Sequence, residues 1–134
     1  TSLVGSTRLF ASLGPFYSNH FSPMTPVLPS HIVCANGLTP MLDTLGTVLC
    51  DPGEAFLVPT PYYNAFRDDL RGKAGVELLD GIVSEGQHGE MGEIAALERT
   101  MEENVRAGRP TVRAVLVTNP HNPLGPSTSR CLLL

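Results

Sequence analysis

Short apolar runs alternate with amphipathic helical patterns along this chain of 134 residues, and this alternation limits its fold more than any other feature. The strand-like runs cover residues 55–58, 76–79 and 112–118, and the last of them has the β-branched composition of a central parallel strand. Strands that alternate with helices predict a mostly parallel sheet with helices on both faces. The sequence therefore predicts an α/β fold.

The helices are expected from apolar residues that recur along one face. Residues 6–21 have a helical pattern that Gly14-Pro15 is expected to interrupt, and residues 64–70 fit a short helix. A further short strand is expected at residues 31–34. Two helices have a clear apolar stripe: Met41, Leu42, Leu45, Val48 and Leu49 in the first, and Ile94, Leu97, Met101 and Val105 in the second. In a fragment of a larger domain, we expect the second stripe and the strand at residues 112–117 to be poorly covered.

The composition of the chain indicates that it is part of a larger domain. Apolar residues make up 42% of the chain, which is enough for a core, but charged residues make up only 16%. A free-standing domain usually has about 25% charged residues. We therefore expect residues 1–134 to be a fragment of a larger domain, which fits a truncated product.

Charge and cysteine content narrow the class of protein further. The formal charge is −4 without a cluster of Lys or Arg, so nucleic acid is not an expected partner. No run approaches the ~18 apolar residues of a membrane span, so no membrane association is expected. Cys34, Cys50 and Cys131 fit no zinc-binding spacing, and no metal is expected. We interpret Cys34 and Cys50 as buried thiols, which favours a reducing compartment such as the cytoplasm.

The first motif that could bind a ligand is Ala-Asn-Gly-Leu-Thr-Pro at residues 35–40, between a predicted strand and a helix. The first N–H groups of a helix lack partners and can bind a phosphate. Gly37 would let the backbone approach the phosphate, and the Thr39 hydroxyl could add a hydrogen bond. The alternative is an ordinary turn in which Thr39 is the N-cap.

Two further motifs each follow a predicted strand. Pro-Thr-Pro-Tyr-Tyr at residues 59–63 could offer a flat aromatic face to a ring, or its tyrosines could be core residues. Asn-Pro-His-Asn-Pro-Leu-Gly at residues 119–125 contains two Asn-Pro pairs, and the amide of Asn122 could donate to a phenolate-type oxygen. The alternative there is an Asx-type turn, with His121 facing solvent.

These motifs, in this order and spacing, resemble the fold-type-I pyridoxal-phosphate enzymes. The closest resemblance is to the 1-aminocyclopropane-1-carboxylate synthase group of the class I and II aminotransferases. Residues 25–33, 51–63, 66–70 and 119–125 carry it. The resemblance covers residues 16–125, whereas residues 126–134 diverge from the helix that the family would have there.

The resemblance implies a cofactor, pyridoxal 5′-phosphate, and a role for each matching residue. Leu38 and Thr39 would supply backbone N–H groups to its phosphate, Tyr63 would stack on its pyridine ring, and Asn122 would hydrogen-bond its ring hydroxyl oxygen. The cofactor would supply the electron sink while the protein orients it. It also implies an amino-acid substrate, either transamination or elimination as the reaction, and a homodimer in the full-length parent.

Some positions depart from the family pattern. Leu38 stands where a small residue is usual, Leu42-Asp43 stand where Asn-Glu is common, and Asn64 stands where proline is usual. The family's Schiff-base lysine, its substrate-binding Arg and its Asp partner for the pyridine nitrogen lie beyond the Asn-Pro turn. The only lysine here, Lys73, does not match that catalytic position. We therefore predict no catalytic residue, and an inactive chain.

Two other classes of function remain open from the sequence. One is a nucleotide-binding α/β domain with phosphate at residues 37–39, although a Gly-rich fingerprint and a ribose-binding acid are missing. The other is a non-catalytic interaction protein that retains part of the fold, which the missing catalytic lysine favours.

Overall fold

The computed structural model describes residues 5–86 and 90–125. The chain divides into two compact units between Met41 and Leu42, and each unit is described by itself. Helix α2 (Leu38–Leu49) contains this boundary, so its first residues belong to the first unit.

The first unit is built on helix α1 (Thr7–Phe21), which begins where the Ser6 hydroxyl oxygen accepts a hydrogen bond from the Leu9 N–H. The predicted interruption at Gly14-Pro15 is wrong, because α1 continues through both residues. Gly14 is buried, and a Cβ atom there would lie 2.7 Å from the carbonyl oxygen of Val27. The Val27 N–H also donates to the Ser18 hydroxyl over 3.0 Å. This packing against the connector favours an unbroken helix despite the backbone hydrogen bond that proline removes.

The predicted strand at residues 31–34 is also absent. A 3₁₀ turn, η1 (Pro29–His31), occupies its start, and the Nδ1 atom of His31 accepts a hydrogen bond from the Leu28 N–H. Residues 32–35 have no regular secondary structure. A strand needs a neighbour for its backbone groups, and none of the described residues pairs with this segment.

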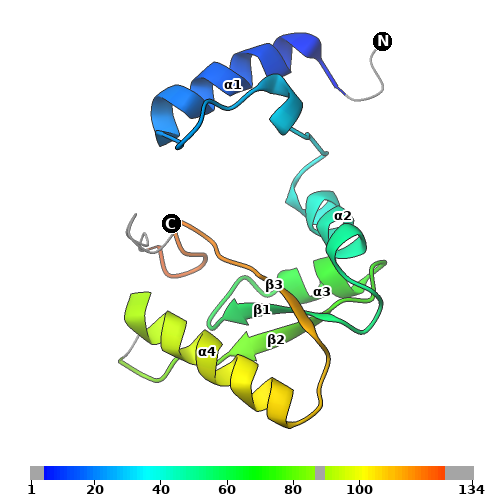
Figure 1. Cartoon of the computed structure of the whole chain (residues 1–134), viewed down its shortest axis with the longest axis vertical. Coiled ribbons are helices and arrows are strands. Elements are labelled where there is room, and N and C mark those ends of the chain that lie inside the picture. Colours follow the sequence, from blue (N-terminus) through cyan, green and yellow to red (C-terminus); the bar gives the residue numbers. More distant parts are fainter. Residues whose placement is uncertain (1–4, 87–89, 126–134) are drawn as a thin grey trace. The chain divides into compact units, whose positions relative to one another are not determined.

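The second unit contains a parallel sheet, which confirms the α/β prediction. Its strands are β1 (Ala55–Pro59), β2 (Glu77–Gly81) and β3 (Val112–Val115), and their order is β2-β1-β3 (Figure 1). All five residues of β1 are buried, so β1 is the central strand of the described sheet. The sequence favoured residues 112–118 for that place, but β3 lies at an edge and its residues alternate between half-buried and exposed.

Helices cover both faces of this sheet (Figure 1). Helix α3 (Phe66–Arg71) connects β1 to β2, and α4 (Glu90–Arg106) connects β2 to β3 on the opposite face. The chain moves across the sheet in one direction from β1 to β2, and in the other direction from β2 past β1 to β3. Because crossovers between parallel strands are right-handed, the two connecting helices lie on opposite faces. The core lies on the α3 face, where Phe66 and Leu70 pack against Phe56 and Val58 of β1.

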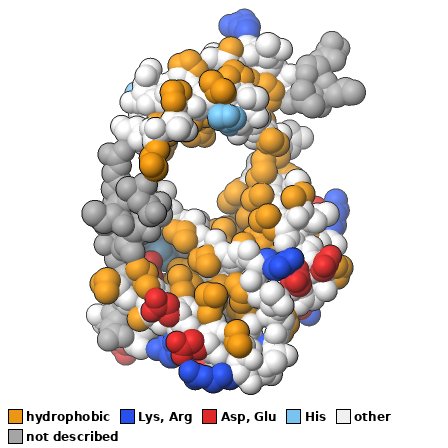
Figure 2. All heavy atoms as spheres, viewed as in Figure 1, with side chains coloured by type: hydrophobic (Ala, Val, Ile, Leu, Met, Phe, Trp, Pro, Cys, Tyr) orange, Lys and Arg blue, Asp and Glu red, His pale blue; other side chains and the backbone are white. Residues whose placement is uncertain are grey.

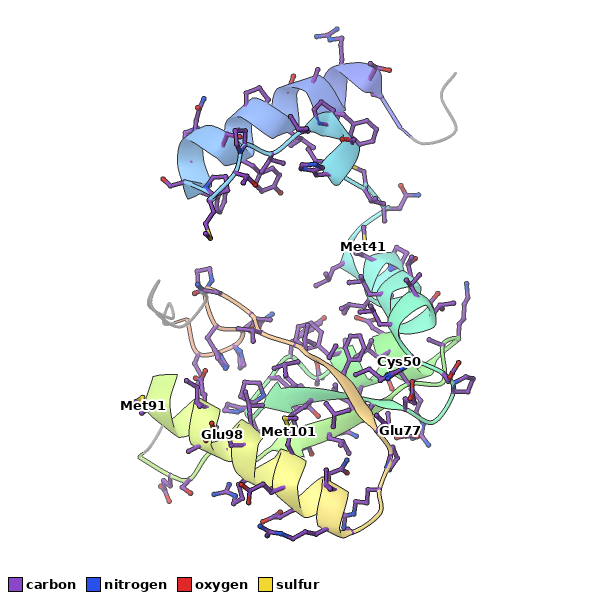
Figure 3. All side chains as sticks on the ribbon, in the orientation of Figure 1. Met41, Cys50, Glu77, Met91, Glu98 and Met101 are labelled. Carbon is purple, nitrogen blue, oxygen red and sulfur yellow. The ribbon has the colours of Figure 1, made fainter. Side chains whose placement is uncertain are left out.

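The buried residues of α2 and α4 are mostly not those of their apolar stripes. In α2 the buried positions are Leu42 and Gly46, followed by Cys50, at a spacing of four residues. Gly46 allows a close approach, because a Cβ atom there would lie 3.0 Å from the Cβ of Ala74. In α4 the buried residues are Ala96 and Asn104. Leu45, Val48 and Leu49 of the α2 stripe are exposed. Met101 (labelled in Figure 3) and Val105 are exposed too, as expected for the poorly covered stripe of α4.

Large apolar side chains are exposed in both units. Figure 2 shows many of them on the visible surface, mixed with charged side chains in the second unit. In the second unit they include Val115, at the end of β3, and Val117, two residues further along the chain. No helix within the described part of the chain has the length and hydropathy needed to cross a membrane.

Candidate functional site

Two of the three sequence motifs lie at one edge of the sheet. The Thr60–Tyr63 turn follows the carboxyl end of β1, and the 118–125 turn follows β3. Because β1 and β3 are parallel neighbours, both turns leave the sheet at its carboxyl edge. In open α/β sheets this is the edge where ligands bind.

The Thr60–Tyr63 turn is fixed at its start by β2. The Thr60 N–H donates to the carbonyl oxygen of Gly81 over 2.9 Å, and the Val83 N–H donates to the Thr60 hydroxyl over 3.4 Å. The peptide bond between Thr60 and Pro61 is cis. At the other end, the Phe66 N–H donates to the carbonyl oxygen of Tyr63 over 3.1 Å, which joins the turn to α3.

Tyr62 is held by an ion pair between α3 and β2. Its hydroxyl donates to Asp80 Oδ1 over 2.7 Å and accepts from the Arg67 guanidinium over 2.6 Å. The same Arg67 nitrogen lies 2.7 Å from Asp80 Oδ1, and the other terminal nitrogen of Arg67 donates to the Leu78 carbonyl oxygen over 3.2 Å. Three side chains from three segments thus meet at the Tyr62 hydroxyl.

This environment changes two pKa values. Burial raises the pKa of Tyr62, and the hydrogen bond to Asp80 and the charge of Asp80 raise it further, whereas Arg67 lowers it. Burial alone would lower the pKa of Arg67, but the hydrogen bond to Tyr62 and the charge of Asp80 outweigh it and raise that pKa. Both effects keep Tyr62 neutral and Arg67 charged.

Tyr63 differs from Tyr62 in its exposure. Tyr62 is half-buried and stacks on Phe66, with ring centroids 6.4 Å apart and an interplanar angle of 20°. Tyr63 contacts Phe66 edge-on, with ring centroids 5.5 Å apart and an interplanar angle of 79°. The Tyr63 residue is 46% exposed. The core-packing alternative therefore fits Tyr62, whereas Tyr63 has ring surface available to a ligand.

The Asn122 turn is closed by hydrogen bonds from its backbone N–H groups to side-chain and backbone acceptors of the same segment. The Asn122 N–H donates to the Thr118 hydroxyl over 3.1 Å, and the Gly125 N–H donates to the His121 carbonyl oxygen over 2.7 Å. His121 is half-buried, and its Nδ1 atom accepts from the Leu124 N–H over 3.4 Å, so it stabilises the turn and does not simply face solvent. The Asn122 residue itself is exposed. Two cis peptide bonds precede Pro120 and Pro123.

The third motif is a helix start in the first unit. Gly37 has a φ angle of 101°, which favours glycine, and a Cβ atom there would meet nothing within 4 Å. Helix α2 begins at Leu38, so Leu38 and Thr39 are its first two residues. The first N–H groups of an α-helix have no intrahelical acceptor. A helix start of this kind can bind a phosphate, and that Leu38 and Thr39 do so stays a prediction.

The predicted site residues thus occur in two groups. Tyr63 and Asn122 follow neighbouring strands of the second unit, whereas Leu38 and Thr39 belong to the first unit. That all four share one site stays a prediction. The sequence interpretation missed the pairing of Arg67 with Asp80, because these residues belong to different elements. An aspartate near the end of a half-buried strand, such as Asp80, was the available signal of a partner from another element.

Comparison with known proteins assigns the family. A model of aminotransferase class I and II matches residues 4–131, and the chain belongs to this family. It is 40% identical over 105 residues to 1-aminocyclopropane-1-carboxylate synthase 5 of Oryza sativa subsp. japonica, and the aligned residues cover 78% of this chain and 19% of that protein. It is 36% identical over 124 residues to aminotransferase verI of Clonostachys rogersoniana, and the aligned residues cover 92% of this chain and 28% of that protein.

Solved structures agree on the fold. An aspartate aminotransferase from Thermus thermophilus matches with a TM-score of 0.77 and 20% identity, over 97% of this chain and 33% of that one. An archaeal alanine:glyoxylate aminotransferase matches with a TM-score of 0.76 and 26% identity, over 96% and 30% of the two chains. The chain therefore spans about a fifth to a third of the length of its relatives. Enzymes of this family depend on pyridoxal phosphate.

The described residues hold no group of three or more His, Cys, Asp or Glu side chains that could bind a metal ion. The exposed ring of Tyr63 can stack on a pyridine ring, an exposed amide such as that of Asn122 can donate to a hydroxyl oxygen, and N–H groups at a helix start can bind a phosphate.

Proposed function

We propose that this chain forms part of the pyridoxal-phosphate-binding domain of an amino-acid-processing enzyme, either an aminotransferase or a lyase of the 1-aminocyclopropane-1-carboxylate synthase type. The observation that carries this proposal is the placement of exposed Tyr63 and Asn122 after two neighbouring parallel strands, in a chain of the aminotransferase family. A solved relative in fold from Pyrococcus horikoshii, with a TM-score of 0.72, is a kynurenine aminotransferase in complex with PMP.

Each residue would have a separate task in holding the cofactor. Tyr63 would stack on the pyridine ring, and the Asn122 amide would donate to the ring hydroxyl oxygen. The N–H groups of Leu38 and Thr39 would bind the phosphate at the positive end of α2. When bound, the cofactor supplies an electron sink for the charge that forms when the substrate loses its α-proton.

The wider assignments belong to the same proposal. The substrate is an amino acid, and the full-length parent is a homodimer in the cytoplasm that binds neither membranes nor nucleic acid.

The two described cysteines support a reducing compartment because both are free thiols. Cys50 is buried as expected, but Cys34 is exposed, so only one of the two fits the predicted buried position.

The chain by itself is inactive, because its only lysine, Lys73, does not match the position of the family's Schiff-base lysine.

Titration of the full 134-residue chain with pyridoxamine 5′-phosphate tests the proposal. This probe cannot form an imine with an amine, so it reports the non-covalent site alone. We expect saturable binding that Tyr63→Ala and Asn122→Ala each weaken by about tenfold, the loss expected when one stacking or hydrogen-bonding partner is removed. Tyr17→Ala and Asn19→Ala, on exposed positions of α1, are the matched controls.

The phosphate contribution is separated by a second titration with pyridoxamine, which lacks the phosphate. Tighter binding of the phosphorylated form supports the role of residues 38–39. Equal binding of both forms, or equal binding by Tyr63→Ala and Tyr17→Ala, would contradict the proposed site.

A further inference from the structure

The Thr60–Tyr63 turn is tied by backbone hydrogen bonds at Thr60 and at the Tyr63 carbonyl oxygen, whereas the Tyr63 ring is 46% exposed and contacts Phe66 by its edge. Thr60 is tied to Gly81 and Val83, and Phe66 is 1% exposed in the core. Between these points, Tyr62 is the only residue of the turn whose side chain bonds to two other side chains in the described structure. The orientation of the exposed Tyr63 ring therefore depends in part on how firmly its neighbour Tyr62 is held.

Arg67 and Asp80 restrict Tyr62 in a way that packing alone does not. Stacking on Phe66 leaves a phenol free to slide in its own plane, whereas two hydrogen bonds to its hydroxyl fix that position. The Arg67 guanidinium is fixed in turn by the Leu78 carbonyl oxygen and by Asp80. Because Tyr62 and Tyr63 contact Phe66 in different orientations, a shift of Tyr62 would also change the edge-on contact of Tyr63.

We infer that Arg67 and Asp80 are positioning residues for the cofactor ring: they hold the Tyr62 hydroxyl and thereby keep the Tyr63 ring exposed in a fixed orientation for stacking. This inference rests on the proposed function for the role of Tyr63. Neither residue has to touch the cofactor, and the effect on binding passes through the Tyr62–Tyr63 backbone.

The chain offers matched controls for both residues. Arg71 lies one turn after Arg67 on α3 and pairs with Glu77 of β2 at 3.8 Å, so it also links that helix to that strand. Arg71→Gln and Glu77→Gln therefore remove a similar surface ion pair without affecting Tyr62. Tyr62→Phe keeps the ring on Phe66 and removes only the hydroxyl.

The first measurement needs no cofactor. In a background with Tyr17→Phe and Tyr63→Phe, Tyr62 is the only tyrosine, and its ionisation can be followed by ultraviolet absorbance. Asp80 raises the Tyr62 pKa and Arg67 lowers it. We therefore expect Asp80→Asn to lower that pKa, Arg67→Gln to raise it, and Arg67→Lys to raise it less. The Arg71→Gln control should leave it unchanged, and a merely structural effect would not give opposite signs.

The second measurement is the affinity for pyridoxamine 5′-phosphate with Tyr63 intact. We expect Arg67→Gln, Asp80→Asn and Tyr62→Phe each to raise the dissociation constant by about threefold to tenfold, the range for losing a partly exposed charged hydrogen bond. The Arg71→Gln and Glu77→Gln controls should stay within about twofold of the unaltered chain. Amide hydrogen exchange over residues 61–65, without ligand, should become faster in the three test variants alone.

The two proposals fail in different ways. Loss of binding in Tyr63→Ala, together with unchanged affinity and exchange in Arg67→Gln and Tyr62→Phe, would overturn the positioning role and leave the proposed function intact. No saturable binding by the unaltered chain would contradict the proposed function. Hydrogen exchange and the Tyr62 pKa would then still decide whether Arg67 and Asp80 fix this turn: pKa shifts of the same sign, or unchanged exchange, would refute it.

Discussion

The side-chain amide of Asn104 donates to the carbonyl oxygen of Pro110 over 2.6 Å and so joins the last turn of α4 to the segment that enters β3. The Arg109 N–H returns a hydrogen bond to the Asn104 carbonyl oxygen over 3.1 Å. Asn104 is only 5% exposed, and its Oδ1 atom has no partner among the described residues. One buried polar residue thus sets the path from α4 into the sheet.

Asn104→Ala is expected to lower the free energy of unfolding by about 1 kcal/mol. The variant loses the bond to Pro110, which contributes about 0.5–1.5 kcal/mol, and removal of the unpaired Oδ1 offsets part of that loss. Urea denaturation followed by circular dichroism measures the change. The control is Glu98→Gln, an exposed position on the same helix (labelled in Figure 3), which should change stability by less than about 0.5 kcal/mol. Equal stability of both variants would show that the bond contributes little.

The order of strands and helices was predictable because it depends on local patterns. The runs at 55–58 and 76–79 became β1 and β2 within two residues at each end, and the helix expected around the stripe from Ile94 to Val105 became α4. The two strands are short runs rich in apolar residues and flanked by Gly or Pro, and α4 has apolar residues at helical spacing, which are the patterns that indicate strand and helix. The resemblance to the aminotransferases, which rests on turn motifs, was confirmed by the family model.

Which helix face is buried was harder to predict, because it depends on close contacts between elements distant in sequence. Gly46 has no side chain and therefore adds nothing to an apolar stripe, yet it is the point at which α2 approaches Ala74 and Val76. The exposed residues Leu45 and Val48 dominated the predicted stripe instead. The Tyr62–Arg67–Asp80 contacts were missed for the same reason, since Arg67 and Asp80 belong to different elements.

Gly46→Val should destabilise the second unit by about 1–3 kcal/mol. The new side chain would begin 3.0 Å from the Cβ of Ala74 and 3.2 Å from Cγ2 of Val76, and a well-packed core accepts added carbon atoms only with strain. Thr47→Val places the same side chain on the exposed neighbouring position of α2. A lower midpoint of thermal unfolding in Gly46→Val alone supports the close approach. Similar midpoints would mean that α2 can move away from the sheet without cost.

Cys34 should react with a thiol reagent at least about tenfold faster than Cys50 near neutral pH, because only the thiolate is nucleophilic. Cys34 is exposed, whereas Cys50 is buried at the end of α2 (labelled in Figure 3). Burial raises the pKa of Cys50, and the charge of Glu54 raises it further. The thiolate of Cys50 is therefore scarce below its raised pKa. Cys131→Ser removes the third thiol, and iodoacetamide labelling with mass spectrometry gives both rates.

The unfolded chain is the control for this comparison. In concentrated urea the two cysteines should react at similar rates, because burial no longer distinguishes them. A fast reaction at Cys50 in the native chain would place that thiol outside the core that contains Leu42 and Phe56.

Lys73 should not act as the cofactor's covalent partner. It is exposed, in the connection between α3 and β2. That connection lies at the amino edge of the sheet, where the Gly53 N–H before β1 donates to the Gly75 carbonyl oxygen over 2.9 Å. Tyr63 follows the carboxyl end of β1, at the opposite edge. A ring stacked on Tyr63 would therefore have the length of a strand between it and the Lys73 amine, and a covalent link needs the amine beside the ring.

Mixing the chain with pyridoxal phosphate, reducing with borohydride and mapping the product by mass spectrometry tests this expectation. We expect at most partial labelling of Lys73, at the level that Tyr63→Ala and Asn122→Ala also give, and no transfer of amino groups between amino and keto acids. Labelling by pyridoxal, which lacks the phosphate, should be comparable, because an exposed amine has no phosphate site beside it. Stoichiometric labelling of Lys73 that either variant abolishes would refute the prediction, since it would require the amine and the Tyr63 ring to share one pocket.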